Sequence, residues 1–546
     1  MVRTCRFGAA LGGLFALATP ACLDHPLKPV KHDTEGVASG GLPLSLNKDV
    51  DILFVIDNSG SMAEEQATLA RNFERFISTL ETDNVEANYR IAVTTTDAGH
   101  VYQCGNTGPE VGRFQLTSCL QRPNEFVFQS DDRFDEACAS ICTHAGLATT
   151  PTHTLYDPED KPRPWLESIE GVTNLPDGIG TAEAFECFGP QGIGGCGFES
   201  TLESMRLALT RANKVDEPSY GFMRPGAILA IVFVTDEEDC SARKDPEYRE
   251  VWADDGNKVF WSEENLEMGP TSEVCWNAGV ECDGGPGTYS ECRPADKAID
   301  GGPADPDESV LYGVQSYIDF VQEIEAQKRD LDATAEVLVA VLAGVPSGYA
   351  TGSAEIVYSD GDDAVFLANM GIGAGCSSAN GMAVPPVRLR SFAEAFALSD
   401  EVKDRNLYSV CEEDYSPALE QIADMIRDRL RPACMPKCVA DLNPLTDELD
   451  PECVLRETYR DESGKSHEVS VPACAEDGAG AAVLPEGAEL CYVTLTGDEL
   501  DEECSADGWN LQFDVLRGPE AERSQGSTVT ASCVVSQQED IDCPGL

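Results

Sequence analysis

Runs of consecutive apolar residues alternate along much of the chain with segments whose apolar side chains recur every three or four positions. Such runs are typical of strands covered on both faces, and the periodic segments are typical of amphipathic helices. A candidate capping box, Ser200 with Glu203, begins one helix. This alternation predicts an α/β domain with a doubly wound, mostly parallel sheet. The predicted strands lie at 50–56, 89–95, 227–234, 336–342 and 406–410, and the helices at 64–80, 200–212, 310–324 and 419–426.

Three stretches rich in cysteine, glycine and proline interrupt this alternation, at about 98–195, 237–307 and 346–404. After residue 433 the pattern changes to short alternating stretches between cysteines and turn residues. Alternation with a period of two predicts strands with one buried face. We therefore expect two parts. An α/β domain with large disulfide-rich insertions covers 49–432, and a small β-rich disulfide module covers 433–546.

The first 22 residues have the composition of a secretory signal, with Arg3 and Arg6 before a short apolar segment. That segment is too short to span a bilayer as a helix, which favours a signal peptide. The small residues before Cys22 resemble a bacterial lipobox, in which this cysteine becomes the lipidated first residue. Ordinary cleavage near Ala21 is the alternative. Residues 23–48 then indicate a tether, so we expect a protein of the bacterial cell envelope, lipid-anchored at the outer membrane or cell surface, or secreted.

The cysteine pattern agrees with export. Apart from Cys5 in the signal and Cys22, twelve of the 22 cysteines lie before residue 412 and eight lie after residue 433. Even numbers on both sides of the boundary favour disulfides within each part, formed in an oxidising compartment. The alternative is zinc binding by closely spaced pairs without histidine, Cys138 with Cys142 and Cys434 with Cys438.

The charge of the chain excludes one class of partner. There are 38 Lys plus Arg against 97 Asp plus Glu, a formal net charge of −59. This surplus repels the phosphate backbone of nucleic acids and anionic lipid headgroups. We therefore expect no nucleic-acid partner, and contact with a membrane only through a lipid anchor.

A motif at the end of the first strand has the composition of a metal site. Asp57, Ser59 and Ser61 occupy alternate positions of a turn directly after residues 50–56. In a doubly wound sheet, ligands bind at the carboxyl ends of the strands, near the point where the strand order reverses. A carboxylate and two hydroxyls are oxygen ligands of the kind that Mg²⁺ prefers. We predict a Mg²⁺ site here, with Mn²⁺ or Ca²⁺ as substitutes; a turn-forming or helix-capping role is the alternative.

The segment 51–62 resembles the start of a von Willebrand factor type A domain with its metal-ion-dependent adhesion site. Residues 232–236 resemble a later strand of that family, whose terminal aspartate, here Asp236, completes the site. The resemblance covers about 49–430. It implies a type A fold, a divalent cation held by Asp57, Ser59, Ser61 and Asp236, and a protein partner that supplies an oxygen ligand to the metal.

The family also carries a metal-binding threonine, and this sequence departs from that pattern. The resemblance places the threonine within 194–201, where Cys196 is closest to the expected position. A cysteine in a disulfide cannot serve as a hard oxygen ligand, so Glu199, Thr201 or water is expected in its place. A glutamate there would leave the metal less attractive to an acidic group of a partner. A disulfide between Cys187 and Cys196 would account for the altered loop.

Other acidic residues are weaker candidates for metal ligands. Asp97 ends the strand at 89–95, where a turn-forming role competes with a place at the rim of the metal site. The acidic stretches 237–239, 305–308 and 360–363 lack the glutamate at the twelfth position of a calcium loop, and we interpret them as solvated loops. The sequence also has neither a His-Glu-x-x-His motif nor a Walker-type phosphate loop.

These observations favour a binding protein over an enzyme. The leading hypothesis is a non-enzymatic adhesion protein that presents a divalent cation to a protein partner. Two alternatives stay open. An exported hydrolase would carry its active site in the insertions, because long loops on a rigid scaffold often carry function. A metal-free type A scaffold would account for the missing threonine.

Overall fold

The computed structural model describes residues 42–543, apart from gaps at 44–47, 83–84, 86, 103, 155–156, 170, 331–334, 380, 398, 400, 403–404, 431–432, 444, 447–448, 461–464, 477–481, 489, 507 and 518–527. The predicted signal, Cys22 with its lipobox, and most of the predicted tether lie outside the described residues. Within the described ranges, none of the helices has the length and apolar character needed to cross a membrane.

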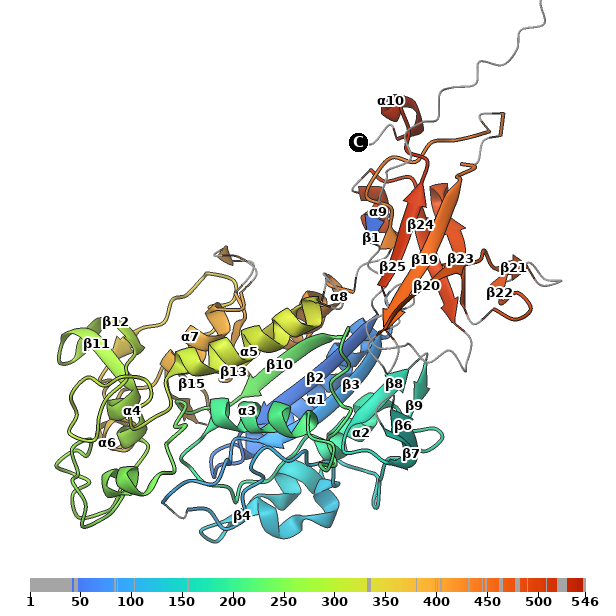
Figure 1. Ribbon diagram of the computed structural model, residues 1–546. Coiled ribbons are helices and arrows are strands. Elements are labelled where there is room, and N and C mark those ends of the chain that lie inside the picture. Colours follow the sequence, from blue (N-terminus) through green and yellow to red (C-terminus); the bar gives the residue numbers. More distant parts are fainter. Residues whose placement is uncertain are drawn as a thin grey trace, which may run out of the picture.

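A seven-stranded sheet forms the centre of the larger part of the molecule (Figure 1). Its strand order is β17-β13-β10-β2-β3-β8-β9. The strands from β17 to β3 are parallel, and β8 and β9 extend one edge in antiparallel pairing. The predicted α/β architecture with a mostly parallel sheet is therefore confirmed. The strands are β2 Asp49–Ile56, β3 Asn88–Thr95, β8 Leu166–Ile169, β9 Val172–Thr173, β10 Ile228–Val234, β13 Val337–Ala343 and β17 Leu407–Ser409.

Helices cover both faces of this sheet because its strands are apolar on both sides. In β2, Ile52 and Phe54 belong to one apolar core, and Leu53 and Val55 belong to another on the opposite face. The first core contains side chains of α1 Ala63–Leu80, α2 Thr181–Phe188 and α8 Ser416–Arg427. The second contains side chains of α3 Thr201–Ala212, α5 Val314–Arg329 and α7 Val387–Glu394.

The strand order places the candidate site. The chain leaves β2 towards β3 and β8 on one side, and later returns to β10 on the other side of β2. The order therefore reverses between β2 and β10. Ile56, the last residue of β2, pairs with Val234, the last residue of β10, so the two strands end next to each other. Ligands of open α/β sheets bind at such a point.

The predicted insertions are less separate from the core than the sequence suggests. The first contains the edge strand β8 and also α2, whose Phe185 packs against Phe54. The third contains α7, whose Phe392 lies in the second core. Their other elements are β4 Val127–Phe128, β5 Asp131–Asp132, β6 Pro151–Thr154, β7 Asp157–Pro162, α4 Glu273–Gly279, β11 Val280–Gly285, β12 Thr288–Pro294, β14 Tyr358–Ser359, α6 Ala364–Met370, β15 Cys376–Ser377 and β16 Met382–Ala383.

Disulfides close within each part, as the even cysteine numbers predict. Because both closely spaced cysteine pairs are oxidised, the zinc alternative is wrong. The predicted bond between Cys187 and Cys196 is also wrong. Cys187 lies in the first core, whereas Cys196 lies in a separate cluster with Trp252, so each has another partner. The bonds are Cys104–Cys196, Cys119–Cys138, Cys142–Cys187, Cys240–Cys275, Cys282–Cys292, Cys376–Cys411, Cys434–Cys504, Cys438–Cys543, Cys453–Cys533 and Cys474–Cys491.

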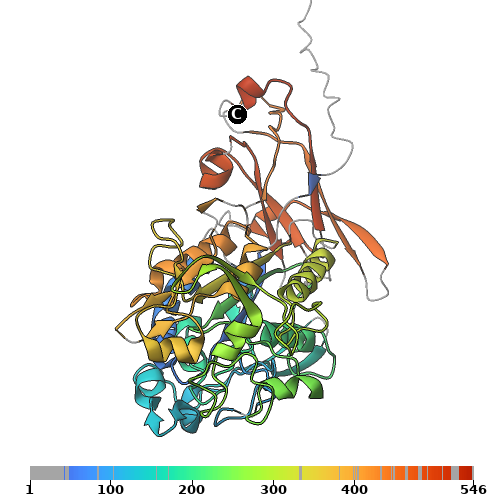
Figure 2. The same ribbon diagram turned by 90° about the vertical axis from the view of Figure 1, so that its left-hand side faces the viewer.

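The C-terminal module consists mainly of two antiparallel sheets, ordered β1-β25-β19-β20 and β18-β24-β23. The first strand, β1 Leu42–Pro43, comes from the predicted tether and pairs with β25, so the tether does not pass the module freely. The module lies beside the amino ends of the parallel strands (Figures 1 and 2). Its other elements are β18 Ala433–Cys434, β19 Cys453–Arg460, β20 Ser466–Val471, β21 Ala475–Glu476, β22 Ala482–Val483, β23 Leu490–Leu495, α9 Glu502–Ala506, β24 Gln512–Arg517, β25 Thr528–Cys533 and α10 Glu539–Asp542.

Candidate metal centre

The turn after β2 and the loop after β10 meet where the strand order reverses. The backbone N–H of Asp57 donates to the carbonyl of Val234 over 2.9 Å and joins the two segments. Asp57, Ser59 and Asp236 are buried, whereas Ser61 is exposed. The structure therefore brings the four predicted ligand residues together, with Ser61 on the side that faces solvent.

Hydrogen bonds fix the carboxylate of Asp57. Its Oδ1 accepts from the N–H of Ser59 over 2.8 Å, and its Oδ2 accepts from the hydroxyl of Thr235 over 2.5 Å. The hydroxyl oxygens of Ser59 and Ser61 lie 3.3 Å apart. The turn thus presents two neighbouring hydroxyl oxygens beside a carboxylate of fixed orientation.

The carboxylate of Asp236 accepts fewer hydrogen bonds than that of Asp57. Its Oδ1 is buried and has no hydrogen-bond partner, although its carboxyl group interacts with the side chain of Ser61. Burial, followed by the charges of Asp57 and Glu237, raises the pKa of Asp236 well above its ordinary value. Burial also raises the pKa of Asp57. A buried oxygen without a donor costs free energy that a bound cation would recover.

The loop before α3 supplies a third carboxylate. Glu199 is fully buried, and its side chain interacts with the carboxyl group of Asp57. The hydroxyl of Thr201, the first residue of α3, is buried without a hydrogen-bond partner. Of the two residues expected in place of the threonine that the resemblance implies, Glu199 is therefore the one that the structure connects to Asp57. Cys196 is in a disulfide with Cys104 and is not available as a ligand.

Two further acids belong to this cluster, and the sequence analysis did not assign them to it. Burial raises the pKa of Glu65 to about 7 and that of Glu237 to about 8, and the charge of Asp57 contributes to both shifts. Glu65 follows Ser61 by four positions, a spacing that places two residues on one side of a helix start. Glu237 directly follows Asp236. These spacings are the signals that could have pointed to both residues.

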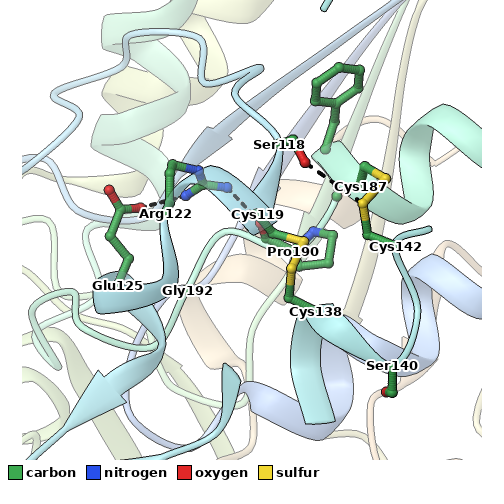
Figure 3. Close-up of a disulfide and its surroundings, with 12 residues drawn as sticks. Ser118, Cys119, Arg122, Glu125, Cys138, Ser140, Cys142, Cys187, Pro190 and Gly192 are labelled. Carbon is green, nitrogen blue, oxygen red and sulfur yellow. Dashed lines mark hydrogen bonds and ion pairs between the residues drawn. A yellow bond between two sulfur atoms is a disulfide. The ribbon is translucent and has the colours of Figure 1, made fainter. Parts of the chain in front are cut away.

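A loop of the first insertion lies beside the turn that follows β2. Gln66 of α1 donates to the carbonyls of Asp57 and Gly192, over 2.7 and 2.8 Å. The guanidinium of Arg122 holds the same loop by donating to the carbonyl of Pro190 over 2.7 Å (Figure 3). The loop is therefore fixed against the candidate ligands. Two disulfides brace its surroundings (Figure 3), Cys119–Cys138 and Cys142–Cys187.

The contact between insertion and turn is close at two glycines. A Cβ atom at Gly195 would lie 2.3 Å from Oδ1 of Asn58, and one at Gly60 would lie 2.7 Å from the ring of Phe128. Phe128 belongs to β4 of the first insertion. The insertion thus packs directly on the turn that carries the candidate ligands.

The acidic stretch 237–239 is buried, so the prediction of a solvated loop is wrong there. Its residues fix two helices. Asp239 accepts from the N–H of Leu202 over 2.9 Å at the start of α3 and forms an ion pair with Arg388 of α7 over 3.0 Å. Glu238 accepts from the N–H groups at the start of α7. The predicted capping box of α3 is also wrong, because the hydroxyl of Ser200 donates to backbone carbonyls instead.

The stretch 305–308 is exposed, as predicted, and the other acidic candidates have structural roles. Asp97 accepts from the N–H of Gly99 over 2.8 Å, as a turn former does. Asp363 accepts from the first N–H groups of α6, and Asp360 accepts from the hydroxyl of Tyr289. In the part of the chain that the structure describes, no three side chains of His, Cys, Asp or Glu form a metal-binding group by themselves. A cation at this centre would therefore depend on the serine hydroxyls as well as on carboxylates.

Comparisons with known proteins give weak similarities. The chain matches no protein-family model, and no curated protein matches it. Two crystal structures of the pilus adhesin SpaC from Lactobacillus rhamnosus GG, one of them in an open conformation, align over 91% and 90% of this chain and 40% of theirs, with 9% and 8% identity and TM-scores of 0.30 and 0.28. The pilus adhesin RrgA from Streptococcus pneumoniae aligns over 90% of this chain and 57% of its own, with 8% identity and a TM-score of 0.22. The chain thus spans less than two thirds of these adhesins, and its similarity to them places it in no family.

Proposed function

We propose that this chain is a von Willebrand factor type A domain protein whose adhesion-type site binds a divalent cation. Ser59, Ser61 and Asp236 would hold the cation, and Asp57 would complete the set while it fixes the turn. The strand order supports this assignment, because Asp57 and Asp236 follow the two adjacent strands between which the order reverses.

The observation that carries the proposal is a group of buried acids without a counter-charge. Several other buried carboxylates of the fold form ion pairs with arginine, whereas among the described residues no ion pair includes Asp57, Glu199 or Asp236. A buried charge without a partner is costly, so a cation bound at this cluster would stabilise the folded chain. Examples of such pairs are Asp51 with Arg224, Glu167 with Arg90 and Asp239 with Arg388.

The cation would supply a Lewis-acidic position for an oxygen atom of a protein partner. The chain's own residues would hold the cation, exclude water on the core side and leave the side of Ser61 open.

We propose a non-enzymatic binding or adhesion role at the bacterial cell envelope, with the chain secreted or anchored through Cys22. Its many disulfides are typical of proteins in oxidising compartments. The candidate site also lies at the opposite end of β2 from β1, where the chain enters the described structure.

The test uses the full chain after removal of metals with EDTA. We expect Mg²⁺, Mn²⁺ and Ca²⁺ each to raise the melting temperature, and a cation at a hundredfold excess over its Kd stabilises by about 2.7 kcal/mol. Asp57→Ala and Asp236→Ala should abolish the shift. Asp283→Asn, at an exposed aspartate paired with Arg293, is the matched control and should retain it.

Absence of any cation-dependent shift in a folded wild-type sample would overturn the proposal. A crystal soaked in Mn²⁺ gives independent evidence. We expect anomalous density between Asp57 and Asp236, and its absence at full soaking would contradict a metal role for these residues.

A further inference from the structure

Glu199 is held in the candidate metal centre by its own backbone. Its carbonyl accepts from the N–H of Cys240 over 2.6 Å, and the N–H of the next residue, Ser200, donates to the carbonyl of Thr96 over 3.0 Å. Disulfides brace both sides of this contact, Cys104–Cys196 and Cys240–Cys275. The loop therefore has little freedom to carry the side chain away from the site.

The carboxylate of Glu199 has one satisfied and one unsatisfied oxygen. Oε2 accepts from the hydroxyl of Thr96, which directly follows β3. Oε1 is buried and has no hydrogen-bond partner. The same carboxyl group interacts with Asp57. A fully buried carboxylate thus reaches Asp57 from a third segment, with one oxygen that no donor satisfies.

We infer that Glu199 is a direct ligand of the cation, at the place where the resemblance expects a threonine hydroxyl, and that it makes the site selective for Ca²⁺ and for uncharged oxygen atoms of a partner. This inference rests on the proposed function. Both oxygens of Asp57 already accept hydrogen bonds. Glu199, Asp236 and Glu65 each keep one buried oxygen without a hydrogen-bond partner, and of these three Glu199 is the one that comes from the loop before α3.

Ligand number and charge explain the preference. Mg²⁺ requires octahedral geometry and keeps several waters, whereas Ca²⁺ takes six to eight oxygens and accepts bidentate carboxylates. The burial of Asp57, Glu199 and Asp236 leaves little room for water on the core side. A glutamate in place of a hydroxyl also adds one negative charge, which weakens the attraction of the bound cation for an acidic group. A carbonyl or hydroxyl oxygen is then the better ligand from a partner.

The test compares the wild type with Glu199→Gln and Glu199→Thr by isothermal titration of the metal-free full chain. We expect both variants to bind Ca²⁺ about tenfold more weakly, with Mg²⁺ affinity changed by about threefold or less. Acetate serves as a probe for acidic ligands. It should shift the melting temperature of Ca²⁺-loaded Glu199→Thr but not that of the loaded wild type. Glu167→Gln, at a buried glutamate paired with Arg90, is the control and should bind both cations as the wild type does.

The outcomes separate the two proposals. If the wild type binds no cation, the proposed function fails. If it binds cations, and the ratio of Ca²⁺ to Mg²⁺ affinity stays unchanged in both Glu199 variants, this inference fails while the proposed function stands. A crystal structure of the wild type with Ca²⁺ bound decides the matter without variants, because an ion that Glu199 does not contact overturns the inference.

Discussion

Asp236 has a buried oxygen that no hydrogen-bond donor satisfies, and the nearby charges of Asp57, Glu237 and Glu65 repel its own. We expect Asp236→Asn to raise the stability of the metal-free protein and to lower that of the cation-bound protein. In EDTA the variant should be more stable than the wild type by about 1 kcal/mol, because it removes the cost of a buried charge. With a divalent cation the order should reverse, because the variant lacks a ligand. Urea unfolding with and without the cation measures both differences, and a loss of stability in EDTA would contradict the argument.

The surroundings of His100 predict a pH dependence of the unfolding free energy that does not involve a metal ion. Its ring packs against both Phe198 and Trp252, with centroids 4.6 and 4.3 Å away, and its Nε2 is buried without a partner. Burial lowers the pKa of His100 from 6.5 to about 3. Between these values the unfolded chain binds a proton that the folded chain does not bind. The contribution of His100 to stability is therefore present above pH 6.5 and is lost as the pH falls towards 3.

The variant His100→Gln should remove this contribution. Relative to the variant, the wild type should lose about 1.4 kcal/mol of unfolding free energy for each pH unit below its unfolded-state pKa. Urea unfolding curves at several pH values between 4 and 8 measure the difference. Two parallel stability profiles would contradict the assignment of a neutral imidazole to the folded chain.

At the residue level, the sequence predicts four residues that the structure brings together at the candidate site, but it does not predict all the acidic residues buried near them. Asp57, Ser59, Ser61 and Asp236 could be placed together because each follows a long apolar strand, and strand ends meet at one edge of a parallel sheet. The parts played by Glu65, Glu199 and Glu237 depend on which side chains become buried near Asp57. That burial is set by the loops of the insertions, whose paths have no simple periodicity.

Among the secondary-structure elements, the segment after β10 fixes two helices at once. Asp239 lies at the start of α3 and pairs with the fully buried Arg388 of α7. We expect Asp239→Ala to lower the unfolding free energy by about 3–5 kcal/mol, because it leaves the guanidinium buried without its partner. The double variant Asp239→Ala with Arg388→Met should be less destabilised than the single variant. A double-mutant cycle by urea unfolding measures this coupling, and additive effects would contradict it.

Prediction from sequence succeeds for the elements with strong patterns and fails for those fixed by distant contacts. β2, β10 and β13 are long apolar runs, which predict buried strands whatever surrounds them. β8 has only four residues and half of them are polar, so its place at the sheet edge depends on pairing with β3. The start of α3 likewise depends on Asp239, which lies 37 residues from Leu202 in the sequence.

At the scale of the whole molecule, β1 joins the N-terminal end of the described chain to the C-terminal module. A chain that begins at Asp49 would lack this strand and leave one edge of β25 unpaired. We expect faster amide exchange in β25, because unpaired edge groups are open to water. Exchange in β2 should stay unchanged, since β3 and β10 pair with both of its edges. Hydrogen exchange with mass spectrometry compares the two chains, and equal protection of β25 in both would contradict a structural role for β1.

The closure of the disulfides within residues 104–411 and within residues 434–543 could be predicted, because cysteine spacing and composition change clearly near residue 433. The pairing of β1 with the module could not. A two-residue strand has no periodicity, and its partner lies almost five hundred residues away in the sequence.

The position of β2 has a mechanical consequence. β1 precedes its amino end, and Ser59 and Ser61 follow its carboxyl end, so a chain held through its N-terminus and pulled at these serines carries the load along this strand. The load is then resisted in shear by the hydrogen bonds of eight register pairs with β3 and seven with β10. Bonds in shear share the force, whereas bonds at a peeled edge break one after another. If the chain is attached and binds as proposed, the middle strand of the sheet therefore carries the load between the proposed attachment and the proposed binding site.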